Sequence, residues 1–363
     1  MGAVPRTLMV MAGGTGGHIF PGLAVADAMR RRGWQVSWLG TAHGMENELV
    51  PRAGVEMDTI AFAGLRGKGL MHSLKGALAL VKSFFSTSAI LRRRKPDVLI
   101  GMGGYVTVPG GVMARLSGRP LALVNADAAP LLSNRLLAPF ARRVLFGFAG
   151  EFGGLAAKAI VTGNPVRREI AALAAPDVRY ADRSGVLRIL VVGGSLGARV
   201  LNEAVPLALA KFEPALRPQV THQAGKAHGA ALREAYALAG VEAELVDFID
   251  DMPRRLAEAD LVICRAGAIT VAELAVAGVA SVLVPFLAST TSHQRDNAVY
   301  FAKSGAAIHL PQTELSAERL AEILRTTDRA RCLEMATAAR ALGRPDATER
   351  IADILSELAE AGR

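Results

Sequence analysis

Short apolar runs recur along the chain and alternate with longer segments in which apolar residues have helical spacing. The runs are TLMVMA (7–12), QVSWLG (35–40), DVLIGM (97–102), LALV (121–124), LRILVV (187–192), LVDFI (245–249), ADLVIC (259–264) and ASVLVP (280–285). Runs of this length without polar alternation are typical of parallel strands that helices cover on both faces. The pattern therefore predicts an α/β fold built on parallel sheets.

The two halves of the chain open in the same way. TLMVMAGGTGGH and LRILVVGGSLGAR each place a glycine-rich loop between an apolar run and a helical segment. The 363 residues are also enough for two domains of ordinary size. We therefore expect two Rossmann-like domains joined near 162–167, where Gly163, Asn164 and Pro165 interrupt the pattern. Segment 346–362 is expected to form an amphipathic helix that packs on either domain.

Composition supports a folded protein and leaves its partner open. Hydrophobic residues make up 51% of the chain and charged residues 21%, which is enough apolar surface for substantial cores. The formal charge of +9 suits nucleic acid, an anionic membrane surface or a polyphosphorylated substrate. Cys264 and Cys332 are the only cysteines, so the sequence predicts neither a disulfide framework nor a zinc site.

The N-terminal sequence MGAVPRTLMVMAGG lacks the longer apolar run and cleavage site of a signal peptide. No stretch reaches the roughly 18 to 20 apolar residues that a membrane-spanning helix needs. We therefore expect a cytoplasmic protein whose contact with a membrane, if it has one, is peripheral.

Three glycine-rich loops follow predicted strands: GGTGGH (13–18), GMGGY (101–105) and GGSLGAR (193–199). Glycine lets a ligand approach the backbone closely, and the N-terminus of a following helix presents amide groups and a partial positive charge to an anion. Each loop is therefore a candidate phosphate site. The alternative for each is a tight connection that binds no ligand.

Two common nucleotide-binding motifs are missing from these loops. A dinucleotide-binding domain places an acidic residue after its second strand to hold ribose hydroxyls, but here that strand ends in Trp38, Leu39, Gly40 and Thr41. A P-loop would end in Gly-Lys followed by Ser or Thr, and neither GGTGGH nor GGSLGAR does. Hydride transfer and ATP hydrolysis are therefore disfavoured.

A longer series of motifs resembles one enzyme family. In chain order these motifs are GGTGGHIFPGLAVA, GLRGKG (64–69), GMGGY (101–105), GNPVR (163–167), GGSLGAR (193–199), DFIDDM (247–252), RAGAITVAE (265–273) and HQRDNA (293–298). Together they cover nearly the whole chain and resemble the MurG family, the N-acetylglucosaminyltransferases of peptidoglycan synthesis.

The resemblance implies a GT-B fold, in which two Rossmann-like domains face each other across a deep cleft. Residues 1–163 would form the acceptor and membrane-facing domain, residues 164–345 the donor domain, and helix 346–362 would pack back on the first. The implied reaction moves N-acetylglucosamine from UDP-N-acetylglucosamine to the C4 hydroxyl of muramoyl-pentapeptide on undecaprenyl diphosphate. The anomeric centre inverts, lipid II and UDP are the products, and no cofactor is expected.

The resemblance also assigns donor-binding residues. Ser195 would contact the phosphates, Arg167 the diphosphate, Ile249 the uracil through its backbone, Glu273 the ribose hydroxyls and Gln294 the hydroxyls of the transferred sugar. Further donor-side residues are Thr15, Gly16, Gly17, Asp127, Ala268, Ile269, Thr270, Val271 and Ala272. Taken singly, each is of a type that is commoner as a core residue, a turn residue or a surface charge.

His18 is the candidate catalytic base, because inverting transfer must remove a proton from the attacking hydroxyl and an imidazole suits this near neutral pH. The equally weighted alternative is that His18 only hydrogen-bonds a phosphate. Acceptor-binding residues implied by the family are Arg66, Lys68, Gly103, Gly104 and Tyr105. No metal site is expected, and Asp250 and Asp251 are assigned to a turn.

The sequence departs from the family at a few positions. Val124, Asn125, Ala126 and Asp127 replace the usual His-Glu-Gln-Asn, Leu196 replaces a usual Gln, and His293 stands where Gln is common. Asp127 is expected to take over the contact of the family's asparagine. Two other hypotheses stay open on this ground: a catalytically silent UDP-sugar-binding protein, and a transferase with another lipid acceptor.

A basic segment predicts where a membrane would be contacted. Between Asp58 and Asp97 there is no acidic residue, and the basic residues there are Arg66, Lys68, Lys75, Lys82, Arg92, Arg93, Arg94 and Lys95. We expect segment 66–95 to lie on an anionic surface with Leu78, Phe84 and Phe85 toward the lipid. The alternative is a core helix with a solvated basic face. Nucleic acid is not expected as a partner, because only 5% of residues are aromatic and no stacking surface is visible.

Overall fold

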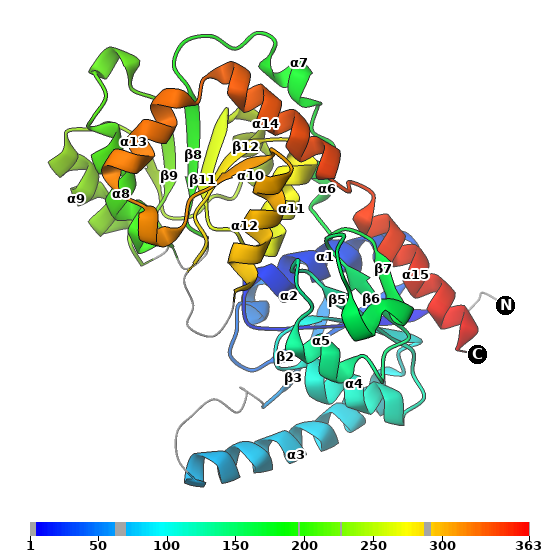
Figure 1. The fold of residues 1–363 in the computed structure, drawn as a ribbon. Coiled ribbons are helices and arrows are strands. Elements are labelled where there is room, and N and C mark those ends of the chain that lie inside the picture. The colour runs from blue at the N-terminus through cyan, green and yellow to red at the C-terminus, as the bar shows by residue number, and fades with distance from the viewer. Residues whose placement is uncertain (1–4, 62–69, 195–196, 226, 287–291, 363) are drawn as a thin grey trace. The chain divides into compact units, whose positions relative to one another are not determined.

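The computed structural model describes residues 5–61, 70–194, 197–225, 227–286 and 292–362, with side chains in helix 70–94 described from residue 78 onward. The chain forms two compact units (Figure 1). Unit 1 comprises Met1–Arg167 together with Asp346–Arg363, and unit 2 comprises Arg168–Pro345. The division falls at Arg167 rather than at residue 163, and the C-terminal segment groups with unit 1.

Unit 1 is built on a seven-stranded sheet in the order β3-β2-β1-β4-β5-β6-β7, in which all pairs are parallel. Its strands are β1 (Thr7–Ala12), β2 (Gln35–Thr41), β3 (Glu56–Ile60), β4 (Val98–Gly103), β5 (Leu121–Asn125), β6 (Arg143–Phe146) and β7 (Ala159–Val161). This confirms the predicted α/β class and the Rossmann-like domain in the first half of the chain.

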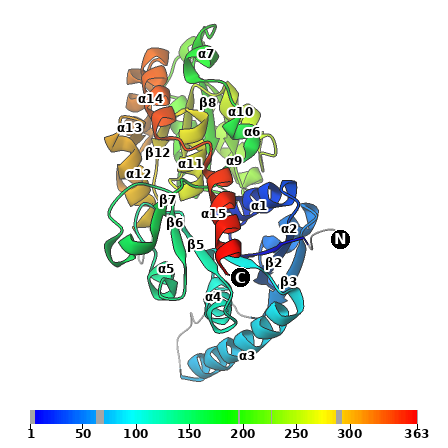
Figure 2. The same cartoon turned by 90° about the vertical axis from the view of Figure 1, so that its right-hand side faces the viewer.

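Helices cover both faces of this sheet, as Figure 2 shows. They are α1 (Gly16–Arg31), α2 (Glu46–Arg52), α3 (Leu70–Arg94), α4 (Thr107–Leu116), α5 (Leu132–Leu137), the 3₁₀ turn η1 (Gly153–Lys158) and α15 (Ala347–Ala361). Side chains alternate along β1: Leu8 and Val10 join the core formed with α1, α2 and α15, whereas Met9 and Met11 join the core formed with α3, α4 and α5. Burial on both faces explains why β1 reads as a continuous apolar run.

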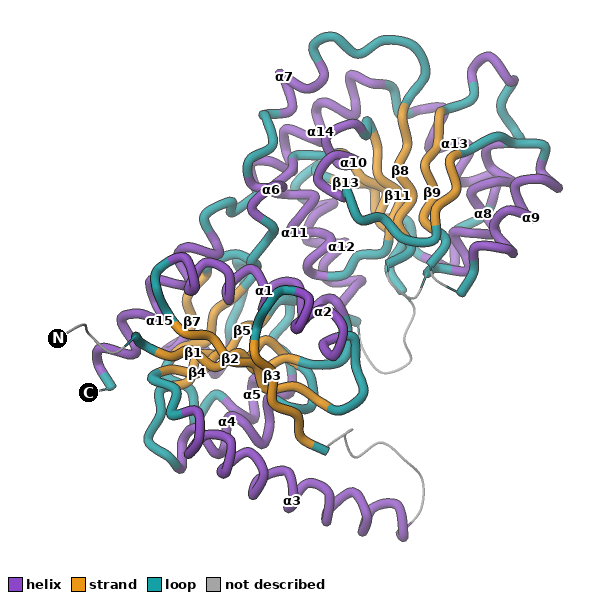
Figure 3. Tube along the Cα trace, turned by 180° about the vertical axis from the view of Figure 1, so that it is seen from behind, coloured by secondary structure: helices purple, strands orange, loops and turns teal. Residues whose placement is uncertain are grey.

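Unit 2 repeats the architecture with six parallel strands in the order β10-β9-β8-β11-β12-β13. Figure 3 shows strands of this sheet in orange and the surrounding helices in purple. The strands are β8 (Arg188–Val192), β9 (Gln219–Gln223), β10 (Glu244–Val246), β11 (Leu261–Cys264), β12 (Ala280–Leu283) and β13 (Ala307–His309). Its helical elements are α6 (Arg168–Ala171), α7 (Pro176–Tyr180), α8 (Arg199–Leu209), η2 (Pro214–Leu216), α9 (Gly229–Ala239), α10 (Met252–Glu258), α11 (Ala268–Ala277), α12 (His293–Lys303), η3 (Gln312–Glu314), α13 (Ala317–Thr326) and α14 (Arg329–Leu342).

Each sheet reverses its strand order beside its first strand. In unit 1 the chain moves from β1 to β2 on one side and later to β4 on the other, and in unit 2 β8 lies between β9 and β11. Ligands of open α/β sheets bind beyond the carboxyl ends of the two strands at such a reversal. The loops after β1 and β4 in unit 1, and those after β8 and β11 in unit 2, are therefore the candidate ligand-binding loops.

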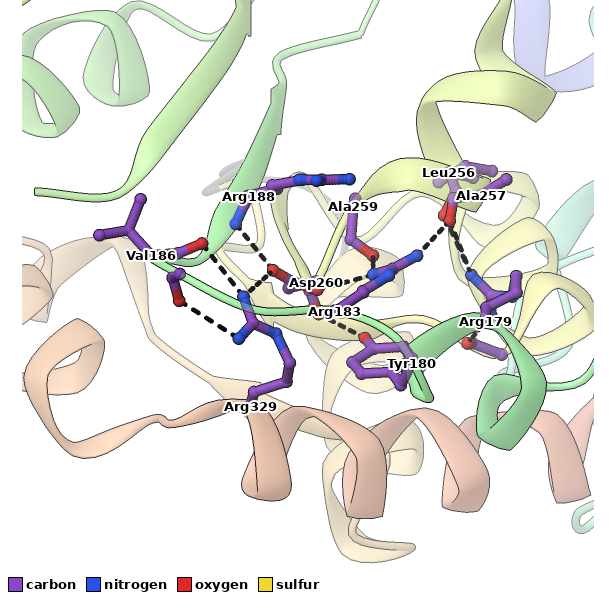
Figure 4. A network of polar contacts seen from close by, with 12 residues as sticks. Arg179, Tyr180, Arg183, Val186, Arg188, Leu256, Ala257, Ala259, Asp260 and Arg329 are labelled. Carbon is purple, nitrogen blue, oxygen red and sulfur yellow. Dashed lines mark hydrogen bonds and ion pairs between the residues drawn. The ribbon is translucent and has the colours of Figure 1, made fainter.

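The opposite end of the unit 2 sheet is held by a buried carboxylate, Asp260, which immediately precedes β11 (Figure 4). Its Oδ1 accepts a hydrogen bond from Arg183 at 2.7 Å, and its Oδ2 accepts from the backbone N–H of Arg188 at 2.8 Å and from Arg329 at 3.1 Å. The Tyr180 hydroxyl donates to its backbone oxygen at 2.7 Å. Burial opposes ionisation, but these donors outweigh it and hold the pKa of Asp260 below its usual value.

Candidate active site

The loop after β1 presents a helix N-terminus at the carboxyl end of the unit 1 sheet. Gly14, Thr15 and Gly17 are exposed there, and Gly16 begins the 16-residue helix α1. Thr15 is the N-cap residue, but its side chain makes no capping hydrogen bond, and the first turn of α1 contains no acidic residue. The arrangement leaves a partial positive charge at the loop, which suits an anionic ligand.

The imidazole of His18 is oriented by the same loop. Its Nδ1 lies 3.2 Å from the backbone oxygen of Gly13. Because a carbonyl oxygen only accepts, this contact assigns the ring proton to Nδ1 in neutral His18 and leaves a lone pair on Nε2. His18 is half-buried. Nε2 can therefore accept a proton, as a general base must.

The loop after β4 packs directly against the loop after β1. Gly103 and Gly104 have φ values of +120° and +86°, which favour glycine. A Cβ on Gly103 would lie 2.7 Å from Nε2 of His18, and one on Gly104 would lie 2.5 Å from the oxygen of Gly13. The two glycine loops that the sequence analysis selected separately thus form one surface, with the exposed side chain of Tyr105 beside it.

The loop after β5 carries Asp127 at the same edge of the sheet. Buried Asn125 organises this loop, because its Nδ2 donates to the backbone oxygens of Asp127 at 2.8 Å and Ala129 at 3.1 Å. Its Oδ1 accepts from the backbone N–H of Leu131 at 2.8 Å. In the sequence Asn125 stands out only as a departure from the family pattern, whereas in the structure it holds the loop after β5.

Arg167 is the last residue along the chain that was predicted for the site and belongs to unit 1. Its guanidinium lies over the ring of Phe20, 5.9 Å from the ring centroid. Phe20 belongs to the first turns of α1, where a Cβ on Gly16 would come 2.9 Å from its ring. Thr15, Gly16, Gly17, His18, Gly103, Gly104, Tyr105, Asp127 and Arg167 are therefore all carried by unit 1 around the carboxyl ends of its strands. Arg66 and Lys68 lie outside the described residues.

Glu46 is a residue of this site that sequence analysis missed. It is fully buried at the start of α2, and its carboxylate accepts hydrogen bonds from Thr41 and from the backbone N–H of Gly14. Burial by itself would raise its pKa, but these hydrogen bonds outweigh that effect and lower the pKa below its usual value. Glu46 is therefore an anion at neutral pH, although no cation is among its recorded hydrogen-bond partners in the described part of the chain.

In unit 2 the corresponding loop lies between β8 and α8. Gly194 and Gly197 have φ values of +86° and +74°, and a Cβ on Gly193 would lie 2.5 Å from the backbone nitrogen of Ala198. Gly197 also packs closely against the backbone oxygen of Ala224. These contacts require glycine at the turn into α8. Ser195 and Leu196, the predicted phosphate contact and the departure beside it, lie outside the described residues.

A buried polar cluster holds the backbone of Ala224, against which Gly197 of this loop packs. His222 on β9 contacts the Tyr236 hydroxyl through Nδ1 at 3.0 Å and Oδ1 of Asn202 through Nε2 at 3.1 Å. Asn202 in turn donates to the oxygen of Ala224 at 3.2 Å. Burial lowers the pKa of His222 to about 3, so its ring is neutral. Sequence analysis gave none of these residues a role.

The predicted ribose and sugar residues, Glu273 and Gln294, lie on the helices that follow β11 and β12. Gly267 caps α11, whose first residues are Ala268, Ile269, Thr270, Val271, Ala272 and Glu273. Buried Asn297 of α12 donates to the oxygen of Ala266 at 3.1 Å and so fixes the turn before α11. Ile249 is buried in the loop after β10. Oε1 of Gln294 accepts from the backbone N–H of Phe286 at 2.9 Å, so part of its hydrogen-bonding capacity is used within unit 2.

Helix α3 carries the predicted membrane segment. Leu78, Val81 and Phe85 are exposed at helical spacings of three and four, and Phe85 is 73% exposed. Phe84 is only half-exposed. Arg93 and Arg94 form ion pairs with Asp58 and Arg94 also pairs with Glu56, so these two charges are partly neutralised. Lys82 is exposed, and the side chain of Lys75 lies outside the described part.

Two features are absent from the residues that the structure describes. No helix there is long and apolar enough to cross a membrane. No group of three or more His, Cys, Asp or Glu side chains in the described ranges could hold a metal ion.

Two Rossmann-like domains, each with a glycine loop at its strand reversal, match the architecture of the GT-B fold class. Residues 8–146 match the glycosyltransferase family 28 N-terminal domain, and residues 188–354 match the family 28 C-terminal domain. The chain belongs to glycosyltransferase family 28.

Relatives that align with nearly the whole chain support the same family assignment. Two proteins named UDP-N-acetylglucosamine–N-acetylmuramyl-(pentapeptide) pyrophosphoryl-undecaprenol N-acetylglucosamine transferase are 66% identical (Janthinobacterium sp. strain Marseille) and 64% identical (Herminiimonas arsenicoxydans), covering 97% of this chain and 99% of each relative. The crystal structure of Acinetobacter baumannii MurG is 37% identical, with a TM-score of 0.82 over 97% of this chain and 100% of that one. These similarities confirm the predicted family and fold class.

Proposed function

We propose that the chain transfers N-acetylglucosamine from UDP-N-acetylglucosamine to the C4 hydroxyl of muramoyl-pentapeptide on undecaprenyl diphosphate, which converts lipid I into lipid II in peptidoglycan synthesis. The observation that carries the proposal is the 66% identity to a relative named for this transfer, which extends over 97% of this chain. The base-competent orientation of His18 supports it from the geometry.

In the proposed reaction the C4 hydroxyl of the acceptor gives its proton to Nε2 of His18 while its oxygen attacks the anomeric carbon of the donor. The bond from that carbon to the UDP oxygen breaks, and UDP leaves with the bonding electron pair. The anomeric centre inverts because attack and departure occur on opposite faces. Positioned proton removal of this kind contributes about 10²- to 10⁴-fold to a rate. The other role open to His18 is a hydrogen bond to a phosphate.

The donor's UDP is assigned to the loops at the carboxyl ends of the unit 2 strands. The family resemblance assigns further donor contacts to Arg167, Thr15, Gly16 and Gly17, which belong to unit 1. The N-terminus of α8 suits the negative charge that develops on departing UDP. Glu273 would accept hydrogen bonds from the ribose hydroxyls, Ile249 would meet the uracil through its backbone, and Gln294 would contact the sugar. The proposal assigns charge neutralisation to α8 and Arg167 rather than to a metal.

The acceptor is assigned to Gly103, Gly104 and Tyr105, with Arg66 and Lys68 as further contacts. We assign Asp127 to a sugar hydroxyl, because a carboxylate beside diphosphates would be repelled unless it accepts a hydrogen bond or pairs with a cation. Asn125 holds the loop that carries Asp127 through a hydrogen bond to the backbone. Asn125 occupies one of the positions at which the family usually has another polar residue, and here its role is structural.

The lipid-linked acceptor would be met at the cytoplasmic face of the plasma membrane, with the protein bound peripherally. The exposed apolar side chains of α3 and the charge of Lys82 support this face as the contact with an anionic surface. Arg93 and Arg94 would add less to this attraction, because both are paired with carboxylates of unit 1.

The deciding experiment incubates purified protein with UDP-N-acetylglucosamine and a lipid I analogue in the presence of EDTA, and measures UDP release and disaccharide product. We expect product from the parent protein, and loss of product with retained UDP binding in His18→Ala. UDP binding without any product would favour the silent binder or another acceptor. Product that appears only without EDTA would overturn the metal-independent assignment.

A further inference from the structure

Glu46 makes an unusual set of contacts for a buried carboxylate. Its Oε1 accepts from the Thr41 hydroxyl at 2.7 Å and from the Thr41 backbone N–H at 3.0 Å, and its Oε2 accepts from the backbone N–H of Gly14 at 3.0 Å. Burying an ionised carboxylate is costly unless its oxygens are hydrogen-bonded. These donors come from the ends of β2 and β1, so the carboxylate joins two neighbouring strands at the site.

The surrounding backbone is shaped to hold this carboxylate. A Cβ on Gly13 would lie 2.7 Å from Oε1, and a Cβ on Gly44 would clash with the whole carboxyl group. Glycine at both positions leaves the room that Glu46 occupies. The N–H of Gly14, which an anionic ligand at this glycine loop would otherwise use, is already bonded to the protein's own carboxylate.

The same loop residues orient His18. Gly14 is bonded to Glu46, and the preceding residue, Gly13, offers its backbone oxygen to Nδ1 of His18. Rotation of the peptide between Gly13 and Gly14 would move that oxygen and the N–H of Gly14 together, because both belong to one planar unit. A hydrogen bond that fixes the N–H therefore also fixes the oxygen.

We propose that Glu46 is a positioning residue for sugar transfer: its buried carboxylate locks the Gly13–Gly14 peptide, whose oxygen holds the proton of His18 on Nδ1 and so keeps Nε2 available as the proton acceptor. Glu46 acts through the loop and touches neither substrate. The inference rests on the function proposed above and adds to it the device that selects the tautomer of the base.

Substitution by glutamine tests the charge with little change of shape. The three hydrogen bonds to Glu46 come from two backbone N–H groups and the Thr41 hydroxyl, and they use both carboxylate oxygens. A glutamine has only one side-chain oxygen to accept them. If that oxygen stays with Thr41, the amide NH₂ faces the N–H of Gly14, so two donors oppose each other and the peptide is released. Glu46→Asp keeps the carboxylate but shortens its reach, so it should keep some of these hydrogen bonds.

The experiment measures steady-state transfer with UDP-N-acetylglucosamine and a lipid I analogue, together with UDP binding and thermal unfolding. We expect Glu46→Gln to lower kcat on the order of 10- to 100-fold, because misplacing a catalytic group by about 1 Å costs that much. UDP affinity should stay within about twofold, because the residues assigned to its uracil and ribose, Ile249 and Glu273, belong to unit 2. Glu46→Asp should recover part of kcat. The matched control is Glu48→Gln, an exposed residue of the same helix, which should behave as the parent.

A spectroscopic readout separates positioning from loss of folding. In ¹⁵N-histidine spectra the parent should show His18 protonated on Nδ1 alone, with the signal assigned by its loss in His18→Ala. Glu46→Gln should show a mixture of both tautomers. An unchanged tautomer, an unchanged kcat, or a Glu46→Asp variant no more active than Glu46→Gln would each overturn the proposal.

If Glu46→Gln does not fold, Thr41→Val carries the test, because it removes one donor and leaves the carboxylate bound to two backbone N–H groups. We expect a fall in kcat of several-fold with UDP binding retained, and an unchanged kcat would contradict the proposal. Failure of the parent protein to transfer sugar would instead refute the proposed function, so the two failures are distinguishable.

Discussion

Gly104 approaches Gly13 so closely that a Cβ on Gly104 would lie 2.5 Å from the backbone oxygen of Gly13, the same oxygen that contacts His18. This oxygen is therefore fixed by its own loop and enclosed by the loop after β4. Substitution at either glycine should disturb the proposed base as well as the backbone.

The first prediction compares Gly104→Ala with Gly118→Ala. Both residues have positive φ, +86° and +70°, so backbone strain alone should cost each variant about 1 kcal/mol of unfolding free energy, and the clash with Gly13 should cost Gly104→Ala more. A Cβ at Gly118 meets nothing within 4 Å, so this variant should keep its transfer activity. Gly104→Ala should also lose activity by more than about tenfold, because the Gly13 oxygen must move. Equal activities in the two variants would contradict this.

The second prediction concerns the carboxylate of Asp260, which holds Arg183 and Arg329 at the far end of the unit 2 sheet. Asp260→Asn should lower the free energy of unfolding by about 3 kcal/mol, because it leaves two half-buried guanidinium groups without their counter-charge. Chemical denaturation measures this loss, and exposed Asp182→Asn is the control.

The difference in unfolding free energy between the parent and Asp260→Asn should also depend on pH, in a direction that the pKa of Asp260 determines. The pKa of Asp260 is lowered in the folded protein, so its stabilisation is complete above the ordinary value of 3.8 and is lost as the pH falls through the lower folded value. The stability difference between the parent and Asp260→Asn should therefore shrink on acidification below about 3.8. A difference that grows in acid would contradict the assignment.

The third prediction concerns the buried imidazole of His222. Because its pKa falls from 6.5 to about 3 on burial, the folded protein resists protonation that the unfolded chain accepts. Between pH 6.5 and about 3, this residue should therefore lower the free energy of unfolding of the parent by on the order of 1.4 kcal/mol for each pH unit of acidification. His222→Gln should remove that part of the acid sensitivity, whereas exposed His43→Gln should not. Denaturation at several pH values between 6.5 and 4 measures both.

The fourth prediction tests the surface of α3. Replacing Leu78, Lys82 and Phe85 together by Ser should weaken binding to vesicles that contain anionic lipid, because both apolar burial and charge attraction are lost. UDP affinity should be unchanged. Leu238→Ser on α9 removes a leucine of unit 2 that is even more exposed than Leu78 and should leave vesicle binding intact. Unaltered vesicle binding of the triple variant would refute the assignment.

The sequence predicted the features that depend on local pattern. Apolar runs such as 7–12 became central strands, and the glycine loops at 13–18 and 101–105 lie at strand ends, because strand burial and positive φ both leave a mark in consecutive residues. The strand reversal that places these two loops side by side followed only from the observed sheet order.

Features that depend on distant pairing escaped prediction. Glu46 reads as the first acidic residue of a helix until the ends of β1 and β2 are seen to converge on it. Asn125 and Asn297 look like ordinary polar residues, since their carbonyl partners are visible only in three dimensions. Arg93 and Arg94 counted as surface charge, because their partners Asp58 and Glu56 lie about 35 residues earlier in the chain.

The return of α15 to unit 1 also has a consequence for biosynthesis. Arg32, the C-cap residue of α1, binds Glu349 at 2.6 Å and Asp353 at 2.7 Å, and Ile351 and Leu355 complete the core beneath α1. On the ribosome the whole of unit 2 must emerge before this helix does. The domain that begins first is thus finished last, and a nascent chain stalled before residue 346 would expose the apolar surface that α15 covers.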